Sequence, residues 1–167
     1  MSDVQRVPTP SSSASSTRHR TLANEAATAA LAIALASHAE IGDVIGLSGP
    51  LGAGKTSFAR AFIQTLAGPL EVPSPTFTLV QTYETESGSI WHFDLYRLAA
   101  PDDAFELGIE DAFAEAISLI EWPERLAHLM PPDWLLIRLN PGAEPATREV
   151  VLSAFGPRAE RLLAGLA

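Results

Sequence analysis

Apolar side chains are spaced at strand and helix periods in turn along the chain. Residues 43–47 form a short apolar run typical of a buried strand, and residues 57–66 carry apolar side chains at helical intervals. Residues 23–39 predict a further helix. Five residues are expected on one side of it: Leu22, Ala26, Ala29, Ala30 and Ile33.

The second half of the chain predicts several short elements. Strands are expected over residues 76–84 and 89–96, and the polar stretch 85–88 between them is a hairpin signal. The remaining expected elements are helical segments at 101–107 and 112–116, a strand at 116–120, a short helix at 123–129, strands at 134–140 and 149–155, and a terminal helix at 157–166. This order predicts the α/β class: a mostly parallel sheet with an antiparallel part, flanked by helices.

Residues 1–20 differ from the rest of the chain in composition. They are rich in Ser, Thr and Pro, so we expect a disordered tail followed by one domain over residues 21–167. The tail's three arginines and one acid superficially resemble a transit peptide, but the tail shows no amphipathic helical pattern. The length of 167 residues suits one domain with a hydrophobic core.

Charge and composition narrow the classes of function. The formal net charge is −9, and Lys55 is the only lysine among 11 basic residues. Autonomous nucleic-acid binders usually carry a basic patch, so any role on RNA is expected to run through a partner. The chain has no cysteine, which excludes disulfides and thiolate metal sites and fits a cytoplasmic protein. Its apolar runs are shorter than the roughly 20 residues of a membrane span.

The most informative motif is a glycine-rich loop between the first predicted strand and the helix that follows it. Residues 49–56 match G-x-x-x-x-G-K-[ST], the P-loop. Its glycines let backbone N–H groups approach phosphate oxygens, and the helix N-terminus adds partial positive charge. Lys55 can reach the β- and γ-phosphates, and the Thr56 hydroxyl can ligate Mg²⁺. The candidate binding residues are Gly49, Leu51, Gly52, Ala53, Gly54, Lys55, Thr56 and Ser57.

Two segments after the P-loop carry further candidate chemistry. Pro73 and Pro75 favour a stiff turn, after which Thr76 stands at a strand entrance. Thr76 is either a sensor of the γ-phosphate or Mg²⁺, or a hydroxyl bonded to its own backbone. Asp94 ends an apolar strand, where a Walker B acid would hold Mg²⁺. His92 shares its strand face, as a supporting group or a structural histidine, and the oxygen preference of Mg²⁺ favours Asp94.

Another apolar strand ends directly in Glu121 and Trp122. Because ligands of open α/β sheets bind beyond the carboxyl ends of the strands, Glu121 is a candidate to order the attacking water or to bind the Mg²⁺ shell. The alternative is an ordinary exposed carboxylate. Trp122 either stacks on a base or caps the sheet. The predicted catalytic residues are Lys55, Asp94 and Glu121, and the predicted metal ligands are Thr56, Asp94 and Glu121.

Four motifs follow one another in a fixed order: Gly-Pro-Leu-Gly-Ala-Gly-Lys-Thr, Ser-Pro-Thr-Phe, His-Phe-Asp-Leu-Tyr-Arg and Glu-Trp-Pro-Glu. Together they resemble the TsaE (YjeE) family, the bacterial P-loop ATPases of tRNA threonylcarbamoyladenosine (t6A) synthesis. The resemblance covers roughly residues 21–155 and leaves out the serine-rich tail.

The resemblance implies a small α/β fold that binds ATP and Mg²⁺. It places Lys55 and Thr56 in the P-loop roles, Thr76 in a switch-like loop, and Asp94 and Glu121 near the metal. It also implies ATP hydrolysis within a complex of the TsaD and TsaB subunits, where TsaD carries out the transfer to adenosine 37, so this chain would meet tRNA only indirectly.

Two other classes of function stay open. One is a small-molecule P-loop kinase, and the other is a nucleotide-sensing module with negligible hydrolysis. Kinases often close an arginine-bearing lid over the transferred phosphoryl group, and the sequence contains no arginine-rich insertion. The residues therefore favour an accessory ATPase over a kinase, whereas they do not separate a slow ATPase from a switch.

Overall fold

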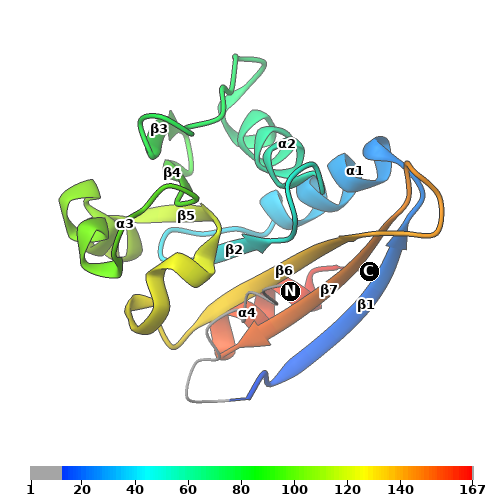
Figure 1. Cartoon of the computed structure of the whole chain (residues 1–167). Helices are drawn as coiled ribbons and strands as arrows, with labels where there is room; N and C mark the ends of the chain where they lie inside the picture. Colours follow the sequence, from blue (N-terminus) through cyan, green and yellow to red (C-terminus); the bar gives the residue numbers. More distant parts are fainter. Residues whose placement is uncertain (1–12, 167) are drawn as a thin grey trace.

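Residues 13–166, the part of the chain that the computed structural model describes, contain a seven-stranded sheet (Figure 1). Its strands are β1 (Ser16–Leu22), β2 (Val44–Ser48), β3 (Val80–Thr85), β4 (Gly88–Asp94), β5 (Ala116–Glu121), β6 (Trp134–Pro141) and β7 (Arg148–Phe155). The order across the sheet is β1-β7-β6-β2-β5-β4-β3.

The centre of the sheet is parallel and its margins are antiparallel. Strands β6, β2, β5 and β4 run in the same direction, whereas β3, β7 and β1 run opposite to their neighbours. The predicted α/β class, with a mostly parallel core and antiparallel strands, is confirmed. Since parallel strands end at one edge, Glu121 at the end of β5 lies beside both Leu47 of β2 and Asp94 of β4.

Helices cover both faces of the sheet. On one face, α1 (Glu25–Ala36), α2 (Lys55–Ala67) and α4 (Pro157–Ala164) share an apolar cluster with alternate strand residues such as Ile45 and Leu47. On the other face, α3 (Ile109–Glu115) and the 3₁₀ helices η1 (Pro101–Leu107) and η2 (Pro123–Leu129) pack with Val44 and Phe93. The period-2 alternation of the strands thus divides the core into two layers. Within residues 13–166, no helix is long and apolar enough to cross a membrane.

Helix α1 is shorter than expected and buries a different side. Asn24 accepts a hydrogen bond from the Ala27 N–H and caps the helix, which runs from Glu25 to Ala36 instead of over residues 23–39. Its buried residues are Thr28, Leu31, Ala32, Leu35 and Ala36. Ile33, which we expected to share a side with Leu22, is 46% exposed. A helix made mostly of alanine has little apolar contrast between its sides, so periodicity was a weak guide here.

The predicted limit of the disordered tail at residue 20 is wrong. Strand β1 begins at Ser16 and pairs with β7 from Ser16–Ala154 to Leu22–Arg148. Most of its side chains are polar and exposed, because an edge strand is held largely by its backbone hydrogen bonds. The Arg18 side chain also donates to the carbonyl oxygen of Leu166. Residues 1–12 of the predicted tail lie outside the described part of the chain.

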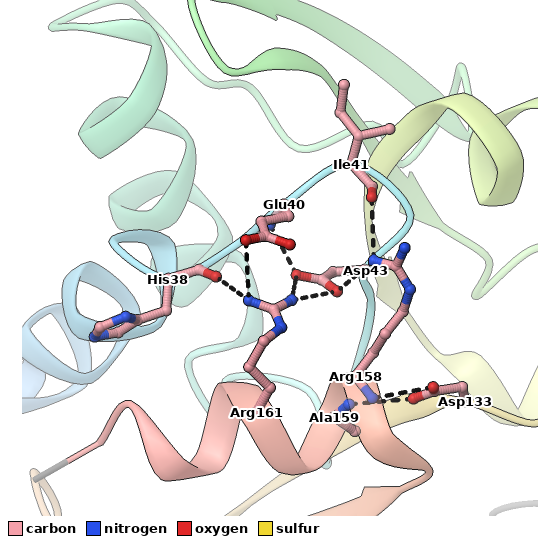
Figure 2. Close-up of polar contacts among 8 residues, drawn as sticks. All are labelled: His38, Glu40, Ile41, Asp43, Asp133, Arg158, Ala159 and Arg161. Carbon is pink, nitrogen blue, oxygen red and sulfur yellow. Dashed lines mark hydrogen bonds and ion pairs between the residues drawn. The ribbon is translucent and has the colours of Figure 1, made fainter.

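An ion cluster ties α4 to the turn between α1 and β2 (Figure 2). The fully buried carboxylate of Asp43 accepts hydrogen bonds from Arg161 Nη2 at 2.7 and 2.9 Å and from Arg158 Nη1 at 3.2 Å. The backbone N–H of Glu40 adds a bond of 2.8 Å. The hydrogen bond to Asp43 raises the pKa of the Arg161 guanidinium above its ordinary value. Two arginines and a backbone donor therefore compensate one buried acid.

Candidate active site

The P-loop follows β2 and leads directly into α2. Gly54, the N-cap residue of α2, has a φ of 103°, a left-handed conformation that favours glycine. Gly49 has a φ of 144°, and a Cβ at this position would clash with the carbonyl oxygen of Leu139 on β6. Gly54 is needed for its backbone conformation. Gly49 is needed both for its backbone conformation and because a neighbouring strand lies too close for a side chain.

Lys55 is folded back against its own loop. Its Nζ donates to the carbonyl oxygens of Gly49 at 2.6 Å and Pro50 at 2.9 Å, and it lies 4.5 Å from the centre of the Trp122 ring. Burial lowers the pKa of Lys55 below its ordinary value, against the opposing effect of nearby carboxylates, of which Glu121 is the largest. The ammonium group is therefore held by neutral oxygens and a ring face at the margin of the site.

A chain of side-chain hydrogen bonds connects the P-loop helix to β5 and β4. The Thr56 hydroxyl donates to Glu121 Oε1 at 2.9 Å, and Glu121 Oε2 lies 2.7 Å from His92 Nε2. His92 is fully buried and Glu121 is 2% exposed. The alternative that Glu121 is an ordinary exposed carboxylate is thereby excluded. Both oxygens of this carboxylate are oriented by neighbours from other elements.

The loop before β3 carries two hydroxyl groups to Asp94. Thr76 Oγ1 lies 3.3 Å and Ser74 Oγ 3.5 Å from Asp94 Oδ2, and the two hydroxyls lie 2.7 Å apart. The strand that we expected from residue 76 begins only at Val80. Leu79 has a φ of 65° and donates its N–H to the Pro75 carbonyl, so the chain turns here before it becomes extended. Thr76 therefore lies in a loop and bonds to Asp94 instead of standing at a strand entrance.

The predicted residues gather around one cavity of about 360 Å³ at the carboxyl edge of the parallel strands. The predicted residues that line this cavity are Leu51, Gly52, Gly54, Lys55, Thr56, Ser57, Thr76, Asp94, Glu121 and Trp122. Two of the predicted residues are not in this lining. Gly49 holds the Lys55 ammonium through its carbonyl oxygen, and Ala53 lines a second cavity.

Trp122 lies at the junction of β5 and η2, in a left-handed conformation with a φ of 61°. Its ring contacts both the Lys55 ammonium and the Tyr96 ring, whose centre is 4.9 Å away. The side chain is largely buried but lines the cavity. It thus both packs at the end of the sheet and faces the site.

The larger cavity also contains three residues that sequence reasoning did not propose as ligand contacts: Ser74, Tyr96 and Arg97. The guanidinium of Arg97 lies 4.8 Å from the centre of the Phe77 ring, and Phe77 is 83% exposed. The alternation Ser74, Thr76 within the proline-flanked segment was an available signal for Ser74. Arg97 is the last residue of the His-Phe-Asp-Leu-Tyr-Arg motif, but no spacing assigned it to the site.

A second cavity of about 260 Å³ adjoins the other side of the P-loop. It shares Gly52, Gly54 and Ser57 with the larger cavity, and it adds residues from α1, the P-loop, the β6–β7 turn and β7. Those additions are Glu25, Thr28, Ala53, Ala146 and Arg148. The P-loop therefore borders two cavities, one that contains Asp94 and Glu121 and one that contains Arg148.

The oxygen ligands at the larger cavity fit a small divalent cation. Within residues 13–166, no group of three or more His, Cys, Asp or Glu side chains is arranged to hold a metal by itself. Mg²⁺ in nucleotide sites commonly takes one or two carboxylates and completes its shell with phosphates and water. Thr56, Asp94 and Glu121 supply carboxylate and hydroxyl oxygens of that kind.

Comparisons with known proteins show the family to which the chain belongs. A family model described as "Threonylcarbamoyl adenosine biosynthesis protein TsaE" matches residues 22–150. The chain belongs to the TsaE family. Its relatives named as TsaE proteins include one from Rickettsia felis, 44% identical over 71% of this chain and 70% of the relative, and one from Bacillus subtilis, 34% identical over 83% and 87%. The resemblance inferred from the four motifs is confirmed.

A crystal structure of Bacillus subtilis YdiB has the same fold. It superposes with a TM-score of 0.74 at 29% identity, over 89% of this chain and 93% of YdiB. TsaE proteins are involved in the biosynthesis of threonylcarbamoyladenosine in tRNA. Family membership and the P-loop fold together indicate a nucleotide-binding protein.

Proposed function

We propose that the protein binds ATP with Mg²⁺ in the larger cavity and hydrolyses it, as an accessory subunit in the threonylcarbamoylation of adenosine 37 in tRNA. One observation carries the nucleotide part of this proposal. Lys55, Asp94 and Glu121 come from α2, β4 and β5 and meet at one cavity beside a P-loop. A cation, two acids and a glycine cradle are the parts that nucleoside triphosphate chemistry requires.

Each of these side chains has a distinct role in the proposal. Lys55 exchanges its two carbonyl partners for phosphate oxygens, which requires only movement of a flexible side chain. Asp94 and Thr56 provide oxygen ligands for Mg²⁺, which when bound neutralises phosphate charge. Glu121, oriented by His92, either completes the metal shell or orders the attacking water.

The two cavities suggest how the nucleotide lies across the loop. Trp122 contacts the ammonium of Lys55, which we assign to the β- and γ-phosphates, so we place Trp122 at the phosphate end. The ribose and base then extend into the second cavity, beside Thr28 and Ser57. A base stacked on Trp122 is the contrary arrangement, and quenching of the fluorescence of that ring by a base analogue tests it.

TsaD and TsaB are the proposed partners. The net charge of −9 opposes approach to a polyanion, so the chain is expected to reach tRNA only through the complex. Co-purification with both subunits, with and without ATP, tests the association, and failure under both conditions rejects it. A gel shift at about 150 mM salt tests the second part, because submicromolar tRNA binding by the isolated chain contradicts an indirect role.

One observation favours a second function, a nucleotide-dependent switch with negligible hydrolysis. The hydroxyls of Ser74 and Thr76 bond to Asp94, one of the proposed metal ligands. Any new partner of this carboxylate competes with both hydroxyls and so releases or reorders the loop. Partner association in Glu121→Gln decides between the two functions. ATP-dependent assembly without turnover favours the switch, and loss of both favours a coupled ATPase.

Turnover measurements test the enzymatic proposal. Phosphate release from ATP by the wild type is expected to require Mg²⁺ and to proceed without a small-molecule acceptor. Turnover that appears only when an acceptor is added would move the assignment to a kinase. The same assay with the TsaD and TsaB subunits present shows whether the partners raise the rate.

A further inference from the structure

Arg148, the first residue of β7, contacts the P-loop across a long stretch of sequence. Its Nε donates to the carbonyl oxygen of Ala53 at 3.1 Å, and its Nη2 donates to that of Gly52 at 3.2 Å. Its Nη1 donates to the carbonyls of Pro145 and Thr147 at 2.8 and 3.0 Å. One guanidinium thus connects the β6–β7 turn to two successive peptide groups of the phosphate-binding loop.

These contacts constrain the direction of the loop's N–H groups. In a trans peptide the C=O and the following N–H point in opposite directions. With the Gly52 and Ala53 carbonyls turned towards Arg148, the N–H groups of Ala53 and Gly54 point away from the guanidinium. The Ala53 N–H also donates to the Pro50 carbonyl at 3.1 Å, which closes a turn. The two bonds from Arg148 thus restrain the direction of these carbonyl groups, and with them the direction of the N–H groups that follow.

Ala53 is buried in the core, but the glycines on either side of it have few packing contacts. Gly52 and Gly54 have φ values of 79° and 103°, and both lack side chains. A Cβ built on Gly52 would meet no atom within 4 Å, and one on Gly54 would meet only Thr28 at 3.9 Å. Glycine segments with so little packing lose conformational entropy when they order around a ligand. A side chain that orders the loop beforehand lowers that cost.

We propose that Arg148 is a positioning residue that holds the P-loop in its phosphate-binding conformation before the nucleotide arrives. This inference rests on the proposed nucleotide site. Arg148 also lines the second cavity, where we place the ribose and base, but each of its three guanidinium nitrogens donates to a backbone carbonyl. We therefore assign Arg148 an action through the loop and not through the nucleoside. The expected effect is on affinity for phosphates. Any ligand with linked phosphates should bind the ordered loop more tightly, whether or not it carries a base.

The test compares two ligands across matched variants. Calorimetry measures the affinities of a non-hydrolysable ATP analogue and of inorganic tripolyphosphate, both with Mg²⁺. Arg148→Gln is expected to weaken both by the same factor, about tenfold or more, because two charge-assisted hydrogen bonds to the loop are lost. Arg148→Lys, which keeps the charge but not the planar fork, is expected to lie between Arg148→Gln and the wild type.

Arg161→Gln is the matched control, since it also removes contacts to a backbone carbonyl and a carboxylate but at α4. It is expected to lower the melting temperature and leave both affinities unchanged. Loss of affinity for the ATP analogue alone overturns the proposal, because Arg148 then contacts the nucleoside. Unchanged affinity for both ligands in Arg148→Gln also overturns it.

Amide hydrogen exchange in the ligand-free protein gives a readout that does not depend on nucleotide binding. Peptides covering residues 49–56 are expected to exchange faster in Arg148→Gln than in Arg161→Gln. Equal exchange in the two variants contradicts the proposal. If the wild type binds neither phosphate ligand, the proposed function fails, and the exchange data alone then decide whether Arg148 orders the loop.

Discussion

Two groups of buried carboxylates in this protein have opposite electrostatic surroundings. Asp43 is fully buried, and two arginines and a backbone N–H bond to it (Figure 2). Asp94 and Glu121 are also buried and are register partners on neighbouring strands. Their bonded neighbours are hydroxyls, a backbone N–H and His92. Within residues 13–166, no arginine or lysine forms an ion pair with either of these two carboxylates.

The difference separates a structural acid from a ligand-binding acid. Burying a carboxylate is costly unless it is paired and hydrogen-bonded, and Asp43 meets that condition inside the fold. Asp94 and Glu121 are hydrogen-bonded, but no arginine or lysine of residues 13–166 pairs with them, and their cavity opens beside a P-loop. Burial alone does not distinguish the two groups. The charge of the bonded neighbours does, and it supports our proposal that a cation completes the second group.

The largest expected effect comes from Lys55→Ala. It removes the one lysine that can offset triphosphate charge at the acidic cavity, so nucleotide affinity should fall about a hundredfold or more, on the order of 3 kcal/mol. Calorimetry with a non-hydrolysable ATP analogue measures it. Arg158→Gln, at the Asp43 cluster, serves as the control and should bind normally. Unchanged affinity together with unchanged turnover in Lys55→Ala would remove Lys55 from the site.

The next largest effect is expected on ATP turnover, which we compare in Asp94→Ala and Asp43→Ala. Asp94→Ala should reduce Mg²⁺-dependent ATP turnover by about a hundredfold, and it should affect metal-free nucleotide binding much less. Asp43→Ala should leave turnover per folded molecule close to wild type. Glu121→Ala is expected to slow turnover with the fold intact. A wild-type Mg²⁺ dependence in Asp94→Ala contradicts the assigned role.

The effects on stability should be reversed, so that substitution of Asp43 destabilises the fold more than substitution of Asp94. Asp43→Asn leaves Arg158 and Arg161 without their shared carboxylate, and the expected loss in free energy of unfolding is about 2–3 kcal/mol. For a domain of this size that corresponds to a fall in melting temperature of roughly 4–12 °C. Asp94→Asn without metal should leave the melting temperature unchanged or raise it, because it removes charge beside Glu121. A large loss of stability in Asp94→Asn would erase the distinction between the two groups.

The smallest effect is expected from deletion of residues 1–12. This segment is rich in Ser, Thr and Pro and precedes β1, so both groups of carboxylates should keep their surroundings. The melting temperature should change by less than about 1 °C. Deletion through Leu22 is the contrasting variant, because it also removes β1 and the contact from Arg18 to Leu166. Equal melting temperatures for the two deletions would show that β1 adds nothing to stability.

The acidic part of the site could be predicted because its signals are local in sequence. Asp94 and Glu121 each end an apolar strand, and the P-loop follows another, so parallel pairing alone brings them to one edge. The placement of Thr76 in a turn depended on the left-handed conformation of Leu79, which is rare for a branched side chain and leaves no sequence signature.

Other features were invisible from the sequence for identifiable reasons. Arg148 bonds to backbone carbonyls of Gly52 and Ala53, and a backbone acceptor carries no residue-type signal. Strand β1 pairs through its backbone at a sheet edge, so its polar side chains resemble a disordered tail. The pairing of Asp43 with two arginines near the other end of the chain required the position of α4.

Calorimetric titration of the wild-type protein with a non-hydrolysable ATP analogue, with Mg²⁺ and then with a chelator, tests whether a metal and a nucleotide complete the pair Asp94 and Glu121. Within residues 13–166, neither Asp94 nor Glu121 forms an ion pair with an arginine or a lysine, so we predict binding at least about tenfold tighter with Mg²⁺ than without it. Equal affinity under both conditions, or no binding under either, would contradict the claim that these two carboxylates are completed by a metal and a nucleotide.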